Sequence, residues 1–193
     1  GADLMYTEFI SSEGLIRDAA KSVIKLDIYE KERPIGIQIF GAEMDSMLQA
    51  IDIVTATGPD IIDINFGCPV KKVVCKNAGA GILRDIPLMV KLTEAMVKRT
   101  HLPVTVKTRL GWDENTKYIE QVAERFREAT GKYPAIISSD LSGWSKTRWD
   151  EQYKRTLQHA FDQSKDWWQQ KGGIVSFAWH WANPTTTAGT FEA

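Results

Sequence analysis

Short apolar runs alternate with segments of helical periodicity along the chain, and this alternation constrains the fold more than any other feature. The runs expected to be strands are Leu4–Phe9, Pro34–Phe40, Ile61–Phe66, Val104–Thr108, Ala135–Ser138 and Ile174–Trp179. As a set they show little alternation of polar residues, which is typical of parallel strands buried on both faces. The sequence therefore predicts an α/β fold with a parallel sheet, either doubly wound or rolled into a (β/α)₈ barrel.

Local start and stop signals place helices between these strands. We expect helices at Ile16–Lys21, from Met44 to the Gly58-Pro59 stop, and at Pro87–Arg99, Tyr118–Glu128 and Asp150–Gln170. Asp85 is the expected N-cap of the Pro87–Arg99 helix, because a short carboxylate can accept hydrogen bonds from free N–H groups in the first turn. A brief extended piece is expected at Ile24–Ile28.

Length and composition limit the possible architectures. The 193 residues, 43% hydrophobic and 25% charged, exclude a disordered, collagen-like or coiled-coil chain and favour a single α/β domain. A complete (β/α)₈ barrel has about 250 residues. We therefore expect a TIM-barrel-like fold that is partial or recombined, with about six parallel strands.

Charge, apolar runs and cysteines narrow the functional classes. The formal net charge is −1, so any RNA binding must come from a local patch. No apolar run reaches the roughly 18 residues of a spanning helix, and we expect a cytoplasmic protein that does not enter membranes. Cys68 and Cys75 are too widely spaced for a typical zinc pair, and the three histidines are scattered, so no metal site is predicted.

Polar residues at and near the carboxyl ends of the predicted strands form the candidate site. Gln38 and Lys107 interrupt apolar strands, Asn65 is near the end of another, and Cys68 follows it in a Gly67-Cys68-Pro69 turn. Parallel strands bring their carboxyl ends to one edge, so these four side chains should converge. Taken singly, each could be a satisfied core residue, and Cys68 could pack as a small apolar side chain.

Five segments in register resemble the tRNA-dihydrouridine synthases of the bacterial B-type subgroup. They are Gly1–Glu13, Arg33–Gly41, Asp63–Val70, Ala78–Gly81 and Val104–Trp112, within residues 1–128. The resemblance implies an FMN-dependent barrel enzyme that reduces uridine in tRNA to 5,6-dihydrouridine, with NADPH as the reductant. We expect the first strand, the last strands and the C-terminal RNA-binding domain of that family to have no counterpart here.

The same resemblance assigns roles to individual residues. Cys68 matches the acid that protonates C5 of uracil after hydride transfer to C6. Gln38 and Lys107 match residues that contact the flavin, and Asn65 matches a residue near both the flavin and the uracil. Weaker candidates for contact with tRNA phosphates are Arg109, Lys71 and Lys72.

The amino-acid composition of the chain changes near Ala129. Six of the seven tryptophans lie between residues 144 and 181, whereas 19 of the 25 acidic residues precede Thr130. Thr130–Ile137 with Asp140, and Gly172–Trp181 with Asn183-Pro184, resemble a β-mannanase of glycoside hydrolase family 26. This resemblance implies a sugar cleft lined by Asp140, Trp179, His180 and Trp181.

The sequence thus resembles a chimera of two partial barrels, with residues 1–128 and 129–193 on either side of a seam inside one α/β domain. Three functions are compatible with it: uridine reduction in tRNA, β-mannanase-like binding or hydrolysis of mannan or oligosaccharide, and an inactive structural chimera. If the six strands do not close, open sheet edges would favour homo-oligomers.

Overall fold

The structure of the chain, a computed structural model, describes residues 4–113, 115–132, 136–140, 162, 165–166, 169 and 174–178. The chain divides into two compact units, residues 1–133 and residues 134–193.

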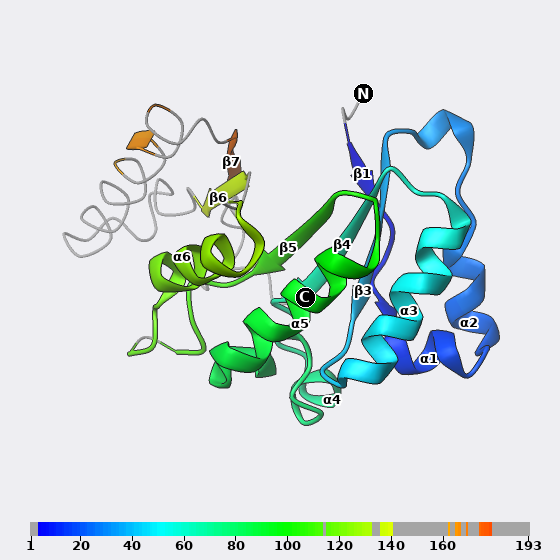
Figure 1. Ribbon diagram of the computed structural model, residues 1–193, viewed down its shortest axis with the longest axis horizontal. Helices are drawn as coiled ribbons and strands as arrows, with labels where there is room; N and C mark the ends of the chain where they lie inside the picture. The colour runs from blue at the N-terminus through cyan, green and yellow to red at the C-terminus, as the bar shows by residue number, and fades with distance from the viewer. Residues whose placement is uncertain are drawn as a thin grey trace, which may run out of the picture. The chain divides into compact units, whose positions relative to one another are not determined.

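The first unit is built on one parallel sheet (Figure 1). Its strands are β1 (Met5–Tyr6), β2 (Ile10–Ser11), β3 (Ile35–Phe40), β4 (Ile61–Phe66) and β5 (Val104–Thr108). They follow the order β1-β3-β4-β5, and β2 also pairs with β3. The expected fold class, α/β with parallel strands in a partial TIM-barrel-like arrangement, is confirmed.

The predicted first strand is interrupted. Met5 pairs with Ile35 and Ile10 pairs with Ile39, so the edge segment carries one more residue than β3 over the same span. Within the interruption, the Thr7 hydroxyl accepts a hydrogen bond from the Gln38 backbone N–H at 3.2 Å. The single strand expected at Leu4–Phe9 is therefore wrong in its bounds.

The helices and 3₁₀ turns follow the strands in the expected alternation. They are α1 (Ser12–Ile16), α2 (Ala20–Val23), η1 (Ile24–Leu26), η2 (Glu30–Glu32), α3 (Met44–Thr57), α4 (Lys71–Val74), η3 (Gly79–Arg84), α5 (Ile86–Arg99) and α6 (Ile119–Thr130). Gly58, in the left-handed conformation, ends α3, and Asp85 accepts a hydrogen bond from the Leu88 N–H at the start of α5. Both signals were predicted from sequence.

Two expectations between β2 and β3 are wrong. The chain turns at Asp18, which has a positive φ of 52°, so the helix expected at Ile16–Lys21 is split into α1 and α2. Of the extended piece expected at Ile24–Ile28, Ile24–Leu26 are instead a 3₁₀ turn that continues from α2, and Asp27 after it has extended dihedral angles. Local backbone hydrogen bonds thus override the strand preference of the apolar residues here.

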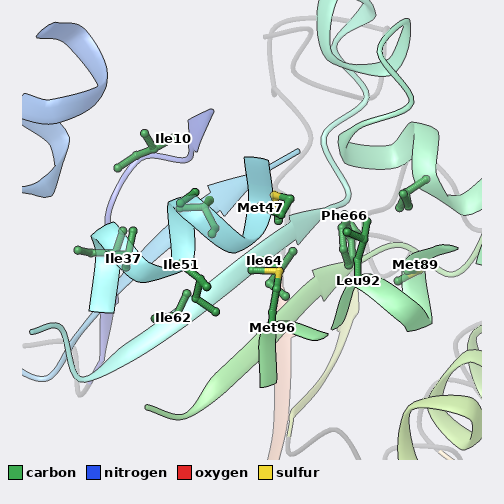
Figure 2. Close-up of a cluster of buried hydrophobic side chains, with 14 of the residues drawn as sticks. Ile10, Ile37, Met47, Ile51, Ile62, Ile64, Phe66, Met89, Leu92 and Met96 are labelled. Atoms are coloured by element: carbon green, nitrogen blue, oxygen red, sulfur yellow. The ribbon is translucent and has the colours of Figure 1, made fainter. Parts of the chain in front are cut away.

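One face of the sheet carries the hydrophobic core. The buried side chains of β3 and β4 that point to this face include Ile37, Ile39, Ile62, Ile64 and Phe66. They pack against methionine, leucine and isoleucine side chains of α3 and α5, as Figure 2 shows. α6 adds Val122 and Phe126 to the same cluster.

The other face of β3, β4 and β5 is polar. The expected lack of polar alternation is therefore wrong, whereas the polar side chains of β3 and β4 are buried, as expected of strands buried on both faces. The side chains on this face come from alternate positions of each strand, so in β3 and β4 each polar residue lies between two apolar neighbours in the sequence. β3 carries one polar side chain, Gln38, and β4 carries two, Asp63 and Asn65, so the alternation extends over only a few residues of each strand.

The second unit contains β6 (Ile136–Asp140) and β7 (Ile174–Ala178), which pair in parallel from Ile136 with Ile174 to Asp140 with Ala178. Of the helix expected at Asp150–Gln170, the structure describes residues 162, 165, 166 and 169, all helical, and the rest lies outside the described residues. In the part of the chain that the structure describes, no helix has the length and hydropathy needed to span a membrane.

Candidate active site

A row of polar side chains crosses the polar face of the sheet from β3 to β5. The register pairs Gln38 with Asp63, Asp63 with Thr105, and Asn65 with Lys107. Gln38, Asp63 and Asn65 are 8%, 4% and 2% exposed, whereas Lys107 is exposed. The structure therefore places Gln38, Asn65 and Lys107 on one face, as their positions in the predicted strands suggested.

Hydrogen bonds join these side chains into a continuous chain. The Thr105 hydroxyl donates to Asp63 Oδ1 at 2.6 Å, and Gln38 Nε2 donates to Asp63 Oδ2 at 2.5 Å. Asn65 Nδ2 then donates to Gln38 Oε1 at 2.8 Å. The described residues contain no buried side-chain nitrogen or oxygen without a partner, so this network compensates for the burial of its polar groups.

The last acceptor in the chain holds the turn that carries the thiol. Asn65 Oδ1 accepts hydrogen bonds from the backbone N–H groups of Gly67 and Cys68, both at 3.0 Å. The Cys68 carbonyl accepts from the Ala80 N–H at 2.9 Å. Both backbone polar groups of Cys68 are thus fixed, and its side chain is only 7% exposed.

The thiol lies in a small apolar cluster of its own. Cys68 packs with Val73 and Ala78, and the partly buried Phe40 and Ala42 lie against them. Gly79 makes this approach possible, because a Cβ built there would lie 2.7 Å from the Cys68 carbonyl oxygen. Cys68 is thus packed as a small apolar residue would be. In addition, hydrogen bonds fix its backbone N–H and carbonyl groups.

Asp63 is the charged group at the centre of the site. Burial raises the pKa of the Asp63 carboxyl, and its hydrogen bonds from Thr105 and Gln38, with the nearby Lys107 ammonium, oppose that rise. Burial also raises the pKa of Tyr6, which Asp63 raises further and a hydrogen bond with Thr105 opposes. The Tyr6 ring lies over Gly36, where an added Cβ would come within 2.4 Å of it.

Sequence reasoning missed Asp63, Thr105 and Tyr6. The signal was present in Ile61–Phe66, where Asp63 precedes Asn65 by two residues and so must share its face. Thr105 is related to Lys107 in the same way on β5. Tyr6 carried no comparable signal, because its place beside Thr105 depends on the strand order β1-β3-β4-β5.

The predicted phosphate contacts surround the Cys68 turn. Lys71 and Lys72 are exposed on α4, which begins directly after Val70. Arg109 is exposed just after β5, and its Cγ lies 3.5 Å from the position of a Cβ built on Gly67. These cations follow the carboxyl ends of β4 and β5, two of them on α4 and one directly after β5.

Other predicted positions are placed elsewhere or are not described. Cys75 is an exposed free cysteine at the end of α4. Asp140 is the last residue of β6, and its side chain lies outside the described part of the structure, as do Trp179, His180 and Trp181. Within the described ranges, no three His, Cys, Asp or Glu residues are grouped so that they could hold a metal ion.

Comparison with protein families gives two matches along the chain. Residues 1–136 match the family described as dihydrouridine synthase, and residues 91–193 match glycosyl hydrolase family 26. The two matches overlap in residues 91–136, which contain most of α5, all of β5 and all of α6.

Individual relatives support the first match. The chain is 43% identical over 131 residues to a Rhizobium leguminosarum protein named "probable tRNA-dihydrouridine synthase", covering 68% of this chain and 41% of that protein. It is 34% identical over 129 residues to tRNA-dihydrouridine synthase B of Pseudomonas aeruginosa, covering 67% of this chain and 39% of that protein. The chain thus spans about two-fifths of the length of these relatives.

Proposed function

The chain belongs to the dihydrouridine synthase family over residues 1–136 and to glycosyl hydrolase family 26 over residues 91–193, and on this basis we propose that its first unit supports FMN-dependent reduction of uridine in tRNA. One observation carries this proposal. A buried cysteine, held through its backbone N–H and C=O, lies next to a hydrogen-bonded polar face that ends in an exposed lysine.

The donors on the polar face fit a flavin ring. Gln38 and Asn65 each use one amide N–H within the network, which leaves each with a second N–H, and Lys107 adds an ammonium group. The carbonyl and imino edge of an isoalloxazine ring is rich in acceptors. FMN, when bound, would supply a hydride to C6 of the uracil, and NADPH would be the reductant.

The roles of the chain's own residues follow from their placement. Cys68 would donate a proton at C5 of the uracil as general acid, which requires a thiol held at a defined position. Asn65 would orient the Cys68 turn and offer its remaining N–H to the flavin or the uracil. Lys107 would stabilise negative charge on the bound ring.

For the RNA partner we propose tRNA, with Arg109, Lys71 and Lys72 contacting its phosphates. Phosphate contacts fix the position and orientation of a nucleic acid without reading its sequence. Cations on α4 and directly after β5 could hold the backbone on either side of a uridine whose base enters the site. A cytoplasmic location is consistent with such a substrate.

The family match over residues 91–193 favours a second candidate function, contact with mannan or an oligosaccharide through Asp140, Trp179, His180 and Trp181. Aromatic side chains could stack on pyranose rings in such a cleft. Retention of the purified chain on a mannan column would support this function, and free elution would exclude it.

The third alternative is an inactive chimera of two partial barrels, and we place the seam between them at residues 128–129. This alternative predicts that neither FMN nor mannooligosaccharide raises the melting temperature of the chain.

A titration with FMN tests the proposed function. We expect the chain to bind FMN, with a change in flavin fluorescence and a higher melting temperature, and Lys107→Ala to weaken binding about tenfold or more. Lys91→Ala is the matched control, because Lys91 is an exposed lysine of α5, the helix that packs on the apolar face of the sheet. Equal binding by Lys107→Ala and Lys91→Ala would contradict the proposed flavin contact.

A second measurement isolates the thiol. With unmodified tRNA and NADPH, we expect dihydrouridine formation to be lost in Cys68→Ala while FMN binding remains. Cys75→Ala should retain activity, because Cys75 is exposed at the end of α4. Normal product formation by Cys68→Ala would exclude Cys68 as the acid.

A further inference from the structure

The buried carboxylate of Asp63 has no role in the function proposed above, although it lies at the centre of the polar network. We propose that Asp63 is a positioning residue whose carboxylate sets the direction of the hydrogen bonds that run from β5 to the Cys68 turn. The inference about bond direction stands on the network itself, and its consequence for ligand binding rests on the proposed function.

The direction of the network follows from the chemistry of an ionised carboxylate, which only accepts hydrogen bonds. Both oxygens of Asp63 are in use, one with the Thr105 hydroxyl and the other with Gln38 Nε2. If the Gln38 amide were flipped, its carbonyl oxygen would face the carboxylate, and two acceptors would be in contact without a proton between them. Asp63 therefore fixes which end of the Gln38 amide points to β4.

The second amide is fixed by the first. Because Gln38 presents Oε1 to β4, Asn65 must turn its Nδ2 toward Gln38, which leaves Oδ1 to face the turn. That oxygen accepts hydrogen bonds from the backbone N–H groups of Gly67 and Cys68. A flipped Asn65 would place an NH₂ group against two N–H donors. The geometry of the Cys68 turn thus depends on a charge located two amides away.

The direction of the hydrogen bonds also determines which ligands the site can bind. With these amide orientations, the groups left over on Gln38 and Asn65 include one N–H each, and Lys107 lies in register with Asn65. The site offers donors, which suits the acceptor-rich edge of a flavin ring or a pyrimidine. Asp63 therefore favours an acceptor ligand without contacting it.

The charged and titratable neighbours of Asp63 come from β1, at the edge of the sheet, and from β5, which pairs with β4. Tyr6 of β1 and Lys107 of β5 both interact with it electrostatically. Protonation of Asp63 would make one of its oxygens a donor, and the direction of the network would no longer be imposed. Since burial raises its pKa, this change should occur at a higher pH than for an ordinary aspartate.

Nitrogen–proton correlation spectra across a pH series test the inference in the full chain. We expect the side-chain NH₂ signals of Gln38 and Asn65 and the backbone N–H signal of Cys68 to shift with one common midpoint. Asp63→Asn should abolish that transition, and Asp45→Asn, which alters an exposed carboxylate in the first turn of α3, should leave it unchanged. Signals that do not titrate together, or a transition that persists in Asp63→Asn, would overturn the inference.

Thr105→Val keeps the test decisive if Asp63→Asn does not fold. The Thr105 hydroxyl favours the ionised form of Asp63, so its loss should move the common midpoint to higher pH. An unchanged midpoint in folded Thr105→Val would overturn the assignment of the transition to Asp63.

Riboflavin provides a separate measurement, because it carries the flavin ring without a titratable phosphate. We expect its dissociation constant to increase about tenfold or more in Asp63→Asn at neutral pH. If the network titrates as expected but the parent chain does not bind riboflavin, the proposed flavin function fails and the positioning role stands. If riboflavin binds equally to Asp63→Asn and the parent chain, the effect of Asp63 on ligand binding is excluded.

Discussion

Gly79 is the residue that allows η3 to approach the Cys68 turn. Its φ is 55°, in the left-handed region, and a Cβ there would lie within 2.9 Å of both the Cys68 carbonyl oxygen and Val73 Cγ1. Both the backbone conformation and the available space thus require glycine. The Ala80 N–H that caps the Cys68 carbonyl depends on the same close approach.

We expect Gly79→Ala to lower the free energy of unfolding by about 2 kcal/mol or more, because left-handed strain and overpacking add together. Gly58→Ala is the matched control, since Gly58 also has a positive φ, 71°, but a Cβ there would meet nothing within 4 Å. It should cost only about 1 kcal/mol. Urea unfolding of both variants would check this, and equal losses would contradict the packing argument.

The sequence singled out those side chains of the candidate site that are conspicuous by type. Gln38, Asn65, Cys68 and Lys107 stand out because they are an amide, a thiol and a cation in or beside apolar strands. Asp63 and Thr105 could have been found by counting two residues back along their strands. The hydrogen-bond partners could not, because they depend on register and on the orientation of two amides, which no local pattern encodes.

At the scale of elements, helix caps are the clearest local determinants. Asp85 Oδ1 accepts a hydrogen bond from the Leu88 N–H at 3.0 Å at the start of α5. Glu43 occupies the equivalent position before α3 but makes no such bond through its side chain. The two helices have the same length of 14 residues, so they form a matched pair.

We expect Asp85→Ala to reduce the free energy of unfolding by about 1 kcal/mol, the usual contribution of an N-cap. Glu43→Ala should change it by less than half as much, because no capping bond is lost. Thermal or urea unfolding followed by circular dichroism measures both. A larger loss in Glu43→Ala than in Asp85→Ala would refute the capping explanation.

Elements bounded by such signals were predicted well, and those bounded by pairing were not. Gly58 and Asp85 act within a few residues of their position, so α3 and α5 could be placed from sequence. The division of the first strand into β1 and β2 follows from an extra residue opposite β3. Such a mismatch arises from the pairing of two strands, so the sequence of either strand alone does not reveal it.

At the scale of the whole molecule, the first unit has its own hydrophobic core. The members of the main cluster run from Ile10 to Phe126 and come from the sheet and the helices that cover it. Burial of one large aliphatic side chain contributes about 1.5–3 kcal/mol. A cluster of this size, formed within residues 1–133, should support a cooperative fold.

We therefore expect residues 1–133, expressed alone, to unfold in a single cooperative transition. Urea unfolding monitored by circular dichroism would measure it. Met96→Ala truncates a fully buried side chain of α5, so it should lower the free energy of unfolding by about 2–5 kcal/mol and move the midpoint to lower urea concentration. A gradual transition without a midpoint would show that residues 134–193 are needed for folding.

The order of the strands also bears on how one chain can combine segments that match two families. From β3 to β5, each strand pairs with the next one in the chain. A division of the chain between β5 and β6 therefore leaves intact the pairings from β3 to β5 and the pairing of β6 with β7. Each set of strands thus has its pairings within one compact unit, although the two family matches overlap in residues 91–136.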